Sequence, residues 1–216
     1  MKILIIIPAR KGSKRLKKKN ILKLGSKSLV QITMEFAKKI KGISDIIVST
    51  DDSEVKKIAK KIHVKAPFDR PAFLSGDKAS TSAACLHALT YYEKNYQSVD
   101  AILLLQPTSP FRSLKSINSA IKTFKKEKSK SIVSVNRLDL KPSTIIKKNN
   151  NQNSYLLKKA TKLYEINGNF YLIDKTLFLS EKKFFFKNTI LFPLIEFKES
   201  IDIDNLNDFK IAKSFL

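Results

Sequence analysis

The loop after the first apolar segment carries residue types that bind phosphate groups. Pro8 to Asn20 reads PARKGSKRLKKKN and follows Lys2 to Ile7, a run typical of a buried strand. Ligands of open α/β sheets bind at the carboxyl ends of the strands. Backbone N–H groups around Gly12, the Ser13 hydroxyl and several cations suit an oxyanion such as a triphosphate. The same residues also fit a solvated basic turn, and neither a Walker A loop nor a dinucleotide fingerprint is present.

A second polar segment also follows an apolar run. Gln106 to Arg112 reads QPTSPFR and comes directly after Ala101 to Leu105. Its two prolines favour an extended, rigid backbone. Hydrogen-bonding groups suited to a ribose or a sugar are present on Gln106, Thr108 and Ser109. The segment also fits a helix entry with Ser113 as N-cap, and the two interpretations are compatible.

A pair of carboxylates lies near the end of the chain, in Ser200 to Asp204 (SIDID). On a strand, residues i and i+2 share a face, so Asp202 and Asp204 would project together while the isoleucines pack behind them. Oxygen-only ligands suit Mg²⁺, which keeps several waters and bridges to substrate phosphates. The alternative is an ordinary amphipathic strand followed by a helix, with Asp204 or Asn205 as its N-cap.

Other chemistry-bearing residues favour structural roles. His63 and His87 have no metal-ligating partner at helical spacing, and no cluster of cysteine and histidine supports zinc. Cys85 has no histidine close in sequence to activate it, so we do not expect a cysteine nucleophile. Asp52 follows a predicted strand and is expected to cap the next helix.

Short apolar runs alternate with helical patterns through the first two thirds of the chain. The expected strands are Lys2 to Ile7, Asp45 to Ser49, Ala101 to Leu105 and Ser131 to Val135. The expected helices are Leu29 to Ile40, Ser53 to Ile62, Ala79 to Asn95 and Ser113 to Lys126. Buried strands separated by helices predict a parallel sheet covered on both faces. The fold class is therefore α/β, doubly wound.

The pattern changes after Val135. A polar, turn-like stretch, Lys147 to Ser154, precedes a strand-rich one, Tyr155 to Asp174. The region near 138–170 is expected to leave the main sheet, either as a loop excursion or as an oligomerisation or lid element. A last strand is expected at Ile195 to Phe197 or Ser200 to Ile203, before a helix over Asn205 to Phe215.

Length and composition indicate one globular domain, residues 1–216. Hydrophobic residues make up 43% of the 216, and the single cysteine excludes an intramolecular disulfide framework. No apolar run approaches the roughly 18 residues of a membrane span. We therefore expect a cytoplasmic protein without a membrane partner.

Charge is the outlying property of the chain. Lys and Arg total 42 against 19 acidic residues, a net charge of +23. Only five of these cations are arginines, the residue favoured for bidentate readout of bases and phosphates. The excess lysine therefore favours compositional drift over nucleic-acid binding. A basic nucleic-acid-binding α/β module remains the alternative from another functional class.

Taken in order, the polar segments resemble the acylneuraminate cytidylyltransferases, or CMP-sialic acid synthetases. The resemblance extends over nearly the whole chain, in the blocks IIPARKGSKRLKKKN, IIVSTDDSEV, RPAFLSGDKAST, LLLQPTSPFR, NGNFYLID and SIDIDNLNDF. It implies a Rossmann-like nucleotidyltransferase fold with a mostly parallel sheet and a small dimerisation excursion. It also implies transfer of CMP from CTP to a sialic-type, nine-carbon sugar acid, with release of pyrophosphate.

The resemblance also implies roles for individual residues. The nucleotide would be bound by Arg10, Gly12, Ser13, Lys19 and Asn20 of the first loop, and its cytosine by Arg70, Ser80 and Thr81. Sugar-binding residues would be Gln106, which also faces the ribose, Lys141 and Tyr171. Asp202 and Asp204 would bind Mg²⁺. The residues implied to be catalytic are Arg10, Lys19 and Asp204.

The sequence departs from the family pattern in the segment Lys147 to Ile166. That segment lacks the arginine of neuraminate-using members, and Ile166 stands where a proline usually precedes the asparagine. Candidate replacements for the missing cation are Lys158, Lys159 and Lys162. The sugar is thus open between neuraminate and a legionaminic- or pseudaminic-type acid, with the eight-carbon acid Kdo as runner-up. A homodimer is expected from the resemblance.

Overall fold

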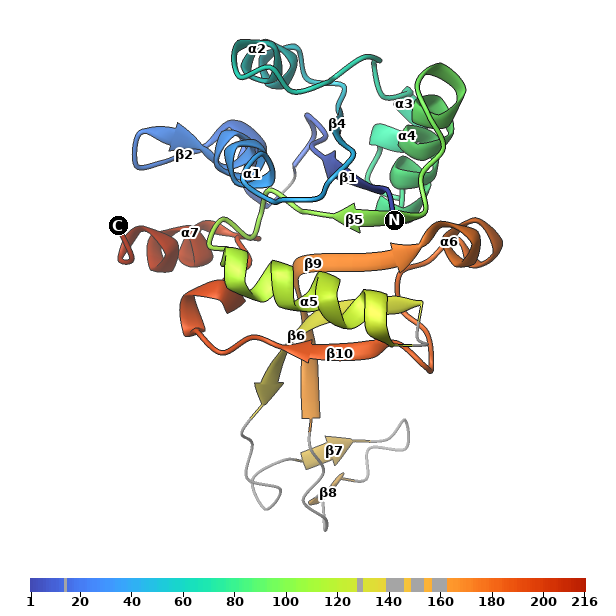
Figure 1. Ribbon diagram of the computed structural model, residues 1–216. Coiled ribbons are helices and arrows are strands. Elements are labelled where there is room, and N and C mark those ends of the chain that lie inside the picture. Colours follow the sequence, from blue (N-terminus) through green and yellow to red (C-terminus); the bar gives the residue numbers. More distant parts are fainter. Residues whose placement is uncertain (14, 128–129, 139–145, 149–153, 157–162) are drawn as a thin grey trace.

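A six-stranded mixed sheet forms the centre of the computed structural model (Figure 1). The structure describes residues 1–13, 15–127, 130–138, 146–148, 154–156 and 163–216. In spatial order, the strands are β10 (Ile190–Pro193), β6 (Ser131–Leu138), β9 (Leu163–Asp174), β5 (Ala101–Leu104), β1 (Ile3–Pro8) and β4 (Asp45–Ser49). Only β9 runs antiparallel to its neighbours. The predicted α/β class with a mostly parallel sheet is confirmed.

Apart from the short helix Ala72–Ser75, whose N-cap is Pro71, the main helices begin at polar caps that the sequence supplies. They are α1 (Leu29–Ala37), α2 (Ser53–Lys61), α3 (Ala72–Ser75), α4 (Thr81–Asn95), α5 (Leu114–Lys126), α6 (Lys175–Glu181) and α7 (Leu206–Lys213). As predicted, Asp52 caps α2 and Ser113 caps α5, each accepting hydrogen bonds from backbone N–H groups of the first turn. Shorter elements are η1 (Lys19–Ile21), β2 (Lys23–Leu24), β3 (Lys27–Ser28) and η3 (Phe197–Ser200).

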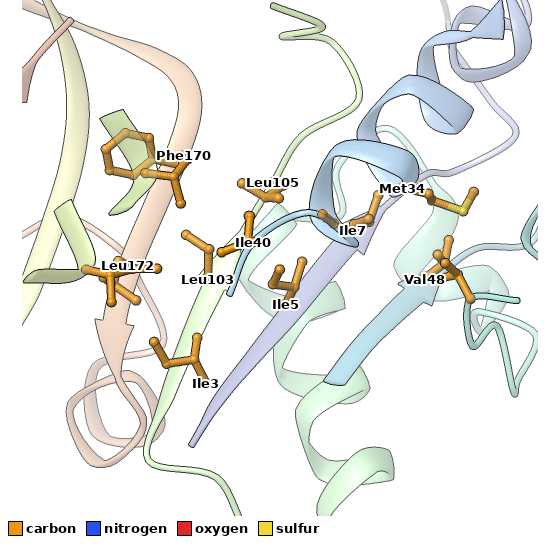
Figure 2. Close-up of a cluster of buried hydrophobic side chains, with 14 of the residues drawn as sticks. Ile3, Ile5, Ile7, Met34, Ile40, Val48, Leu103, Leu105, Phe170 and Leu172 are labelled. Atoms are coloured by element: carbon orange, nitrogen blue, oxygen red, sulfur yellow. The ribbon is translucent and has the colours of Figure 1, made fainter. Parts of the chain in front are cut away.

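The sheet is buried on both faces because its central strands are apolar at successive positions. Ile3, Ile5 and Ile7 of β1 pack in one cluster with Met34 of α1 and Leu103 of β5 (Figure 2). The same cluster includes side chains of α2 and α5. Leu4 and Ile6 point to the opposite face and pack against α4 and α6. Each such fully buried side chain stabilises the fold by about 1.5–3 kcal/mol. The run of isoleucines therefore buries β1 on both faces, although it lies next to the edge strand β4.

The order of the strands creates a crevice at one edge of the sheet. From β1, the chain passes to β4 on one side and later returns to β5 on the other. The connections leaving β1 and β5 diverge there, and ligands of open α/β sheets bind at such a switch point. The loop Pro8–Asn20 and the segment Gln106–Arg112 both begin at this edge.

The prediction of a closing strand at 195–197 or 200–203 was wrong. The last strand is β10, Ile190–Pro193, and residues 197–200 form a 3-10 helix. The SIDID segment pairs with no strand: the N–H of Ile203 donates to the carbonyl of Thr108, at 2.8 Å. Its two isoleucines are nevertheless buried against α7 and its neighbours. The alternation of inward and outward side chains thus persists without a ladder.

The excursion expected near 138–170 is described only in part, and its last residues, 163–170, belong to β9 of the main sheet. Strands β6 and β9 continue as an antiparallel pair to Leu138 and Leu163, beyond the ends of the other strands (Figure 1). Past them, β7 (Ile146–Lys148) and β8 (Ser154–Leu156) form a separate two-stranded sheet. The sugar-binding candidate Lys141, and with it Lys158, Lys159 and Lys162, lies outside the described residues.

Candidate active site

A polar cavity of about 550 Å³ opens at the carboxyl ends of β1 and β5. The loop after β1, the segment before α4, the turn after β5 and the SIDID segment all contribute to its wall. The lining residues are Pro8, Arg10, Ser13, Arg15, Leu16, Lys19, Asn20, Arg70, Leu74, Asp77, Ala79, Ser80, Thr81, Gln106, Pro107, Thr108, Asp202 and Asp204. Four segments far apart in sequence thus meet at the switch point of the sheet.

Most of the residues expected at a site do line this cavity. They are Arg10, Ser13, Lys19, Asn20, Arg70, Ser80, Thr81, Gln106, Asp202 and Asp204. Gly12 is exposed and is not among the lining residues. Tyr171 also lies outside the lining and packs its ring against Phe184, at 5.6 Å between centroids.

The first loop is fastened at both ends by hydrogen bonds. The backbone N–H of Lys11 donates to the Asp51 carboxylate at 2.7 Å, which joins the loop to the end of β4. The side-chain amide of Asn20 donates to the carbonyl of Arg10 at 2.8 Å. Asn20 is nearly buried, at 8% exposed, and closes the loop on itself. The backbone that carries Arg10 and Lys19 is therefore held before any ligand binds.

Arg10 reaches across the cavity to the segment before α4. Its guanidinium donates to the carbonyl of Gly76 at 2.7 Å and lies 3.4 Å from the Asp77 carboxylate. Asp77 itself lines the cavity. These contacts join the first loop to the 70–81 segment.

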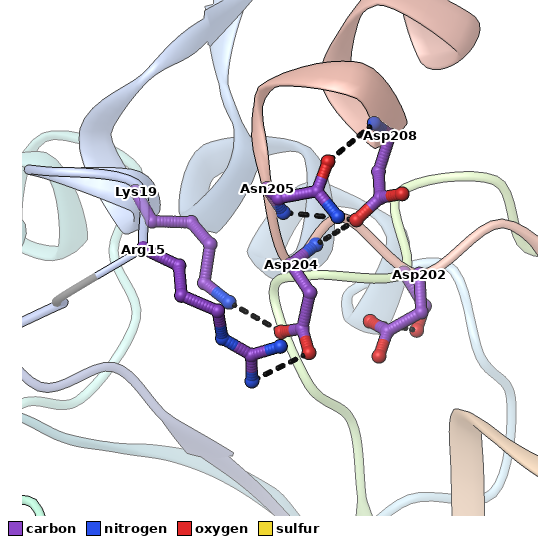
Figure 3. A network of polar contacts seen from close by, with 7 residues as sticks. Arg15, Lys19, Asp202, Asp204, Asn205 and Asp208 are labelled. Atoms are coloured by element: carbon purple, nitrogen blue, oxygen red, sulfur yellow. Dashed lines mark hydrogen bonds and ion pairs between the residues drawn. The ribbon is translucent and has the colours of Figure 1, made fainter.

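Asp204 accepts two cations from the first loop. The Lys19 ammonium and the Arg15 guanidinium each lie 2.9 Å from its carboxylate oxygens (Figure 3). Burial favours a higher pKa for Asp204, but the hydrogen bonds and charges of Lys19 and Arg15 bring it below its ordinary value. Asp204 is therefore ionised at neutral pH and offsets part of the loop's positive charge.

Asp202 lies beside Asp204 in a more buried position (Figure 3). Burial, and to a lesser degree the charge of Asp204, raises its pKa, while hydroxyl groups of Thr108 and Ser109 favour the carboxylate. The segment is fixed from behind, because the Asp208 carboxylate accepts the N–H groups of Asp204 and Asn205, both at 2.8 Å. The capping box of α7 thus sets the direction of Asp204.

Comparison of the sequence with known protein families identifies the family to which this chain belongs. The sequence model described as "Cytidylyltransferase" matches residues 4–213. The chain belongs to the cytidylyltransferase family. It is therefore an enzyme of the nucleotidyltransferase class.

Curated relatives match over almost all of this cytidylyltransferase. A CMP-N,N'-diacetyllegionaminic acid synthase of Legionella pneumophila is 31% identical over 100% of this chain and 97% of its own. A pseudaminic acid cytidylyltransferase of Campylobacter jejuni is 31% identical over 99% of this chain and 95% of its own. An N-acylneuraminate cytidylyltransferase of Escherichia coli is 35% identical over 98% of this chain, which spans 51% of the longer relative.

Solved structures confirm the nucleotidyltransferase fold. A CMP:2-keto-3-deoxy-manno-octonic acid synthetase, determined with CTP, superposes with a TM-score of 0.75 and 18% identity over 100% of this chain and 98% of its own. A 4-diphosphocytidyl-2C-methyl-D-erythritol synthase of Anaerococcus prevotii also superposes with a TM-score of 0.75. Its sequence is 16% identical over 99% of this chain and 97% of its own. At such identities, the likeness concerns the fold alone.

The far wall of the cavity is built from Arg70 and the start of α4. Arg70 is 6% exposed and donates to the backbone carbonyl of Ser49 at 2.6 Å and to its hydroxyl at 3.0 Å. Burial lowers its pKa. The Ser80 hydroxyl accepts the N–H of Ala83, which makes Ser80 the N-cap of α4. The positive end of the α4 dipole therefore faces the cavity.

Three lining residues were not singled out by sequence reasoning for the roles seen here. Arg15 and Asp77 make ion pairs in the cavity, and the side chain of Thr108 contacts Asp202. Arg15 stood within a basic run in which spacing does not distinguish one cation from the next. Asp77 carried no signal, because its partner Arg10 is 67 residues away in sequence.

No helix among the described residues combines the length and apolarity needed to cross a membrane. Within the same part of the chain, no group of three or more His, Cys, Asp or Glu side chains could hold a metal ion. A cation held by the neighbouring carboxylates of Asp202 and Asp204 would therefore need water or a ligand to complete its coordination.

We predict that Cys85 takes no part in catalysis. It is fully buried on α4, and burial raises its pKa to about 12, which leaves almost no thiolate at neutral pH. A thiol reagent such as dithionitrobenzoate should label no thiol in the native protein and one per chain in denaturant. Rapid labelling of the native protein, or loss of activity in Cys85→Ala, would contradict this.

Proposed function

We propose that this cytidylyltransferase activates a nonulosonic acid: CTP and the sugar acid give the CMP-sugar and pyrophosphate. The observation that carries the proposal is the cavity at the switch point, with Arg10, Arg15 and Lys19 on one side and a carboxylate pair on the other. Such a distribution fits a polyanionic nucleotide accompanied by a cation. The names of the curated relatives support the choice of CTP and of a sugar acid.

In this mechanism, the anomeric oxygen of the sugar attacks the α-phosphorus of CTP in line with the leaving group. The bond between the α-phosphorus and the bridging oxygen breaks, and the pyrophosphate carries away the electron pair. The proton of the anomeric hydroxyl passes to a base that we leave unassigned. Chemistry of this kind depends on positioning and on charge neutralisation rather than on a covalent intermediate.

The first loop supplies the charge that the reaction needs. A triphosphate and a sugar carboxylate repel each other, and Arg10 and Lys19 would offset this repulsion. Lys19 is well placed because its side chain is only 15% exposed, so its charge is less screened by water than that of a surface lysine. Arg15 is more open, at 70% exposed, and would meet the outer phosphates. Developing charge on the pyrophosphate would thus be stabilised from the loop.

The carboxylate pair fits Mg²⁺ by its donor chemistry. Asp202 and Asp204 present only oxygen ligands and leave positions for water and for phosphate, as this ion prefers. Bound there, Mg²⁺ would act as a Lewis acid that neutralises phosphate charge. In its absence, Lys19 and Arg15 balance Asp204. Burial raises the pKa of Asp202, and the hydroxyl groups of Thr108 and Ser109 oppose that rise.

The sugar is proposed at the level of its class. Three relatives at similar identity are named for legionaminic, neuraminic and pseudaminic acids, so the comparison favours nine-carbon acids without choosing among them. Kdo is not favoured, because the Kdo-type synthetase shares only 18% identity. Gln106, which lies at the cavity wall, would contact the sugar and the ribose. Roles of Tyr171 and Lys141 at the sugar stay predictions.

We further propose that the excursion near 138–170 is a dimerisation or lid element of a single domain. The support is that the β6–β9 pair extends beyond the other strands, with β7 and β8 as a separate two-stranded sheet past its end (Figure 1). We also expect the enzyme to be a cytoplasmic homodimer. Sedimentation of the purified chain would test the assembly.

The proposed function predicts pyrophosphate release that depends on CTP, on Mg²⁺ and on one nonulosonic acid. The test compares CTP with UTP, ATP and GTP across a panel of nonulosonic acids and Kdo. Release with CTP and a nine-carbon acid alone is the expected result. Turnover of Kdo in preference to every nine-carbon acid, or failure to bind CTP at all, would contradict the proposal.

Asp204→Asn should abolish Mg²⁺-dependent turnover while leaving the fold intact, because the amide neither ligates Mg²⁺ well nor carries charge. We expect a loss on the order of 100-fold or more in kcat. The matched control is Asp69→Asn, a surface aspartate paired with Lys56 and absent from the cavity lining. Near-normal activity of Asp204→Asn would remove the carboxylate pair from the catalytic site.

A further inference from the structure

Strand β9 departs from regular pairing beside the cavity. Val133 of β6 pairs with Tyr171, but Val135 pairs with Ile166. One residue of β6, Ser134, therefore faces four residues of β9, 167–170. Bulges that insert residues into one strand occur often beside active sites, where they redirect a side chain. Here the inserted residues are Asn167, Gly168 and Asn169, which we call the NGN turn.

Buried side chains hold the NGN turn out of the ladder. The Ser134 hydroxyl donates to the side-chain oxygen of Asn167 at 2.6 Å and accepts the N–H of Phe170 at 3.0 Å. The Asn169 side chain donates to the carbonyl of Glu199 at 2.7 Å. Asn167 and Asn169 are 5% and 1% exposed, so these bonds lie away from water. The turn is therefore a fixed part of the core.

Arg112 joins the NGN turn to the turn after β5. Its guanidinium donates to the carbonyl of Asn169 at 2.9 Å and also to the carbonyl of Gln106. A third donor lies 3.3 Å from the Thr33 hydroxyl on α1. One rigid, planar group thus fixes the spacing between the NGN turn and the backbone of Gln106.

Gly168 is the point where the NGN turn approaches the active site. Its φ is +76°, a left-handed conformation that favours glycine. A Cβ at this position would lie 2.8 Å from Oε1 of Gln106, closer than side chains normally come. It would also lie 3.5 Å from the Ser109 hydroxyl and 3.6 Å from the Asp202 carboxylate. The missing side chain therefore leaves the space that the Gln106 amide occupies.

We propose that the NGN turn is a positioning element for the cytidylyl transfer, and that Gly168 sets the place of the Gln106 side chain opposite the sugar. The inference rests on the proposed function, since Gln106 is taken there as a sugar and ribose contact. Gln106 has a flexible side chain, and the backbone of Gly168 limits it from behind. A side chain at 168 would push the amide into the cavity while the backbone network stays in place.

Gly168→Ala tests this, with Gly42→Ala as matched control. Both glycines have a left-handed φ, +76° and +74°, so alanine strains the backbone equally. A Cβ at Gly42 meets nothing within 4 Å. Gly42 lies just before β4, at the amino ends of β1 and β4, whereas the cavity lies at the carboxyl ends. We expect similar losses in Tm. Only Gly168→Ala should lower kcat/KM for the sugar acid, by about tenfold, mainly through KM.

A double-mutant cycle distinguishes positioning from a general structural defect. If Gly168→Ala acts through the Gln106 side chain, it should cost less than about twofold once Gln106→Ala has removed that side chain. The Gly42→Ala control should cost the same small amount in both backgrounds. An equal loss from Gly168→Ala in both backgrounds, or none in either, would overturn the proposal.

A second pair of variants covers the case in which Gly168→Ala does not fold. Ser134→Ala removes the hydroxyl that closes the bulge, and Ser131→Ala removes another buried hydroxyl of β6, which donates to the carbonyl of Phe184 at 2.8 Å. We expect sugar KM to rise several-fold in Ser134→Ala alone. Equal KM values in the two variants would overturn the proposal.

The wild-type assay separates the two levels of inference. Absence of CTP-dependent pyrophosphate release in the wild-type enzyme would defeat the proposed function itself. Normal wild-type turnover with equal behaviour of Gly168→Ala and Gly42→Ala would defeat only the role of the NGN turn.

Discussion

Paired charges hold the first loop of the cavity in place. Arg10, Arg15 and Lys19 converge from one loop, and without a ligand, each lies against a carboxylate of another segment. Unpaired, these cations would repel one another and strain the loop. Paired with Asp77 and Asp204, they hold a geometry in which a polyanion can replace the carboxylates. The site is thus organised before the substrate arrives, which lowers the cost of binding.

The fold supplies this balance by bringing distant segments to one edge of the sheet. The apolar run of β1 fixes the start of the cationic loop, and the capping box of α7 fixes Asp204. Neither the isoleucines of β1 nor the capping residues of α7 line the cavity, yet each set decides where a charged group lies. The buried NGN turn plays the same part for Gln106, from behind the cavity wall. Core packing and helix capping thus set the geometry of the cavity.

Much of this could be predicted from the sequence, because the signals were local. Alternating apolar runs and helical spacing gave the class of the fold, and Asp52 and Ser113 followed the rules of helix capping. The Asp202–Asp204 pair was found through alternation, although no strand forms there: burial of the two isoleucines suffices to project both carboxylates the same way. The cavity then gathered most of the residues expected from the family resemblance.

What escaped prediction depends on contacts between distant segments. The pairing of Arg10 with Asp77, and of Arg15 with Asp204, requires knowing which loops meet. The bulge in β9 is a property of register, visible only when Val135 is seen to pair with Ile166. Likewise, the sequence contains Gly168 without showing that a Cβ there would meet Gln106. Local sequence patterns predict helices and strands, whereas the residues that meet in the site are decided by tertiary contacts.

The most direct test of the exchange of charge is a crystal structure of the enzyme with CTP and Mn²⁺, a substitute for Mg²⁺ with an anomalous signal. We predict Mn²⁺ beside Asp202 and Asp204, with Lys19 and Arg15 turned from Asp204 to phosphate oxygens. A triphosphate bound elsewhere on the surface, or bound while both cations remain on Asp204, would contradict this prediction.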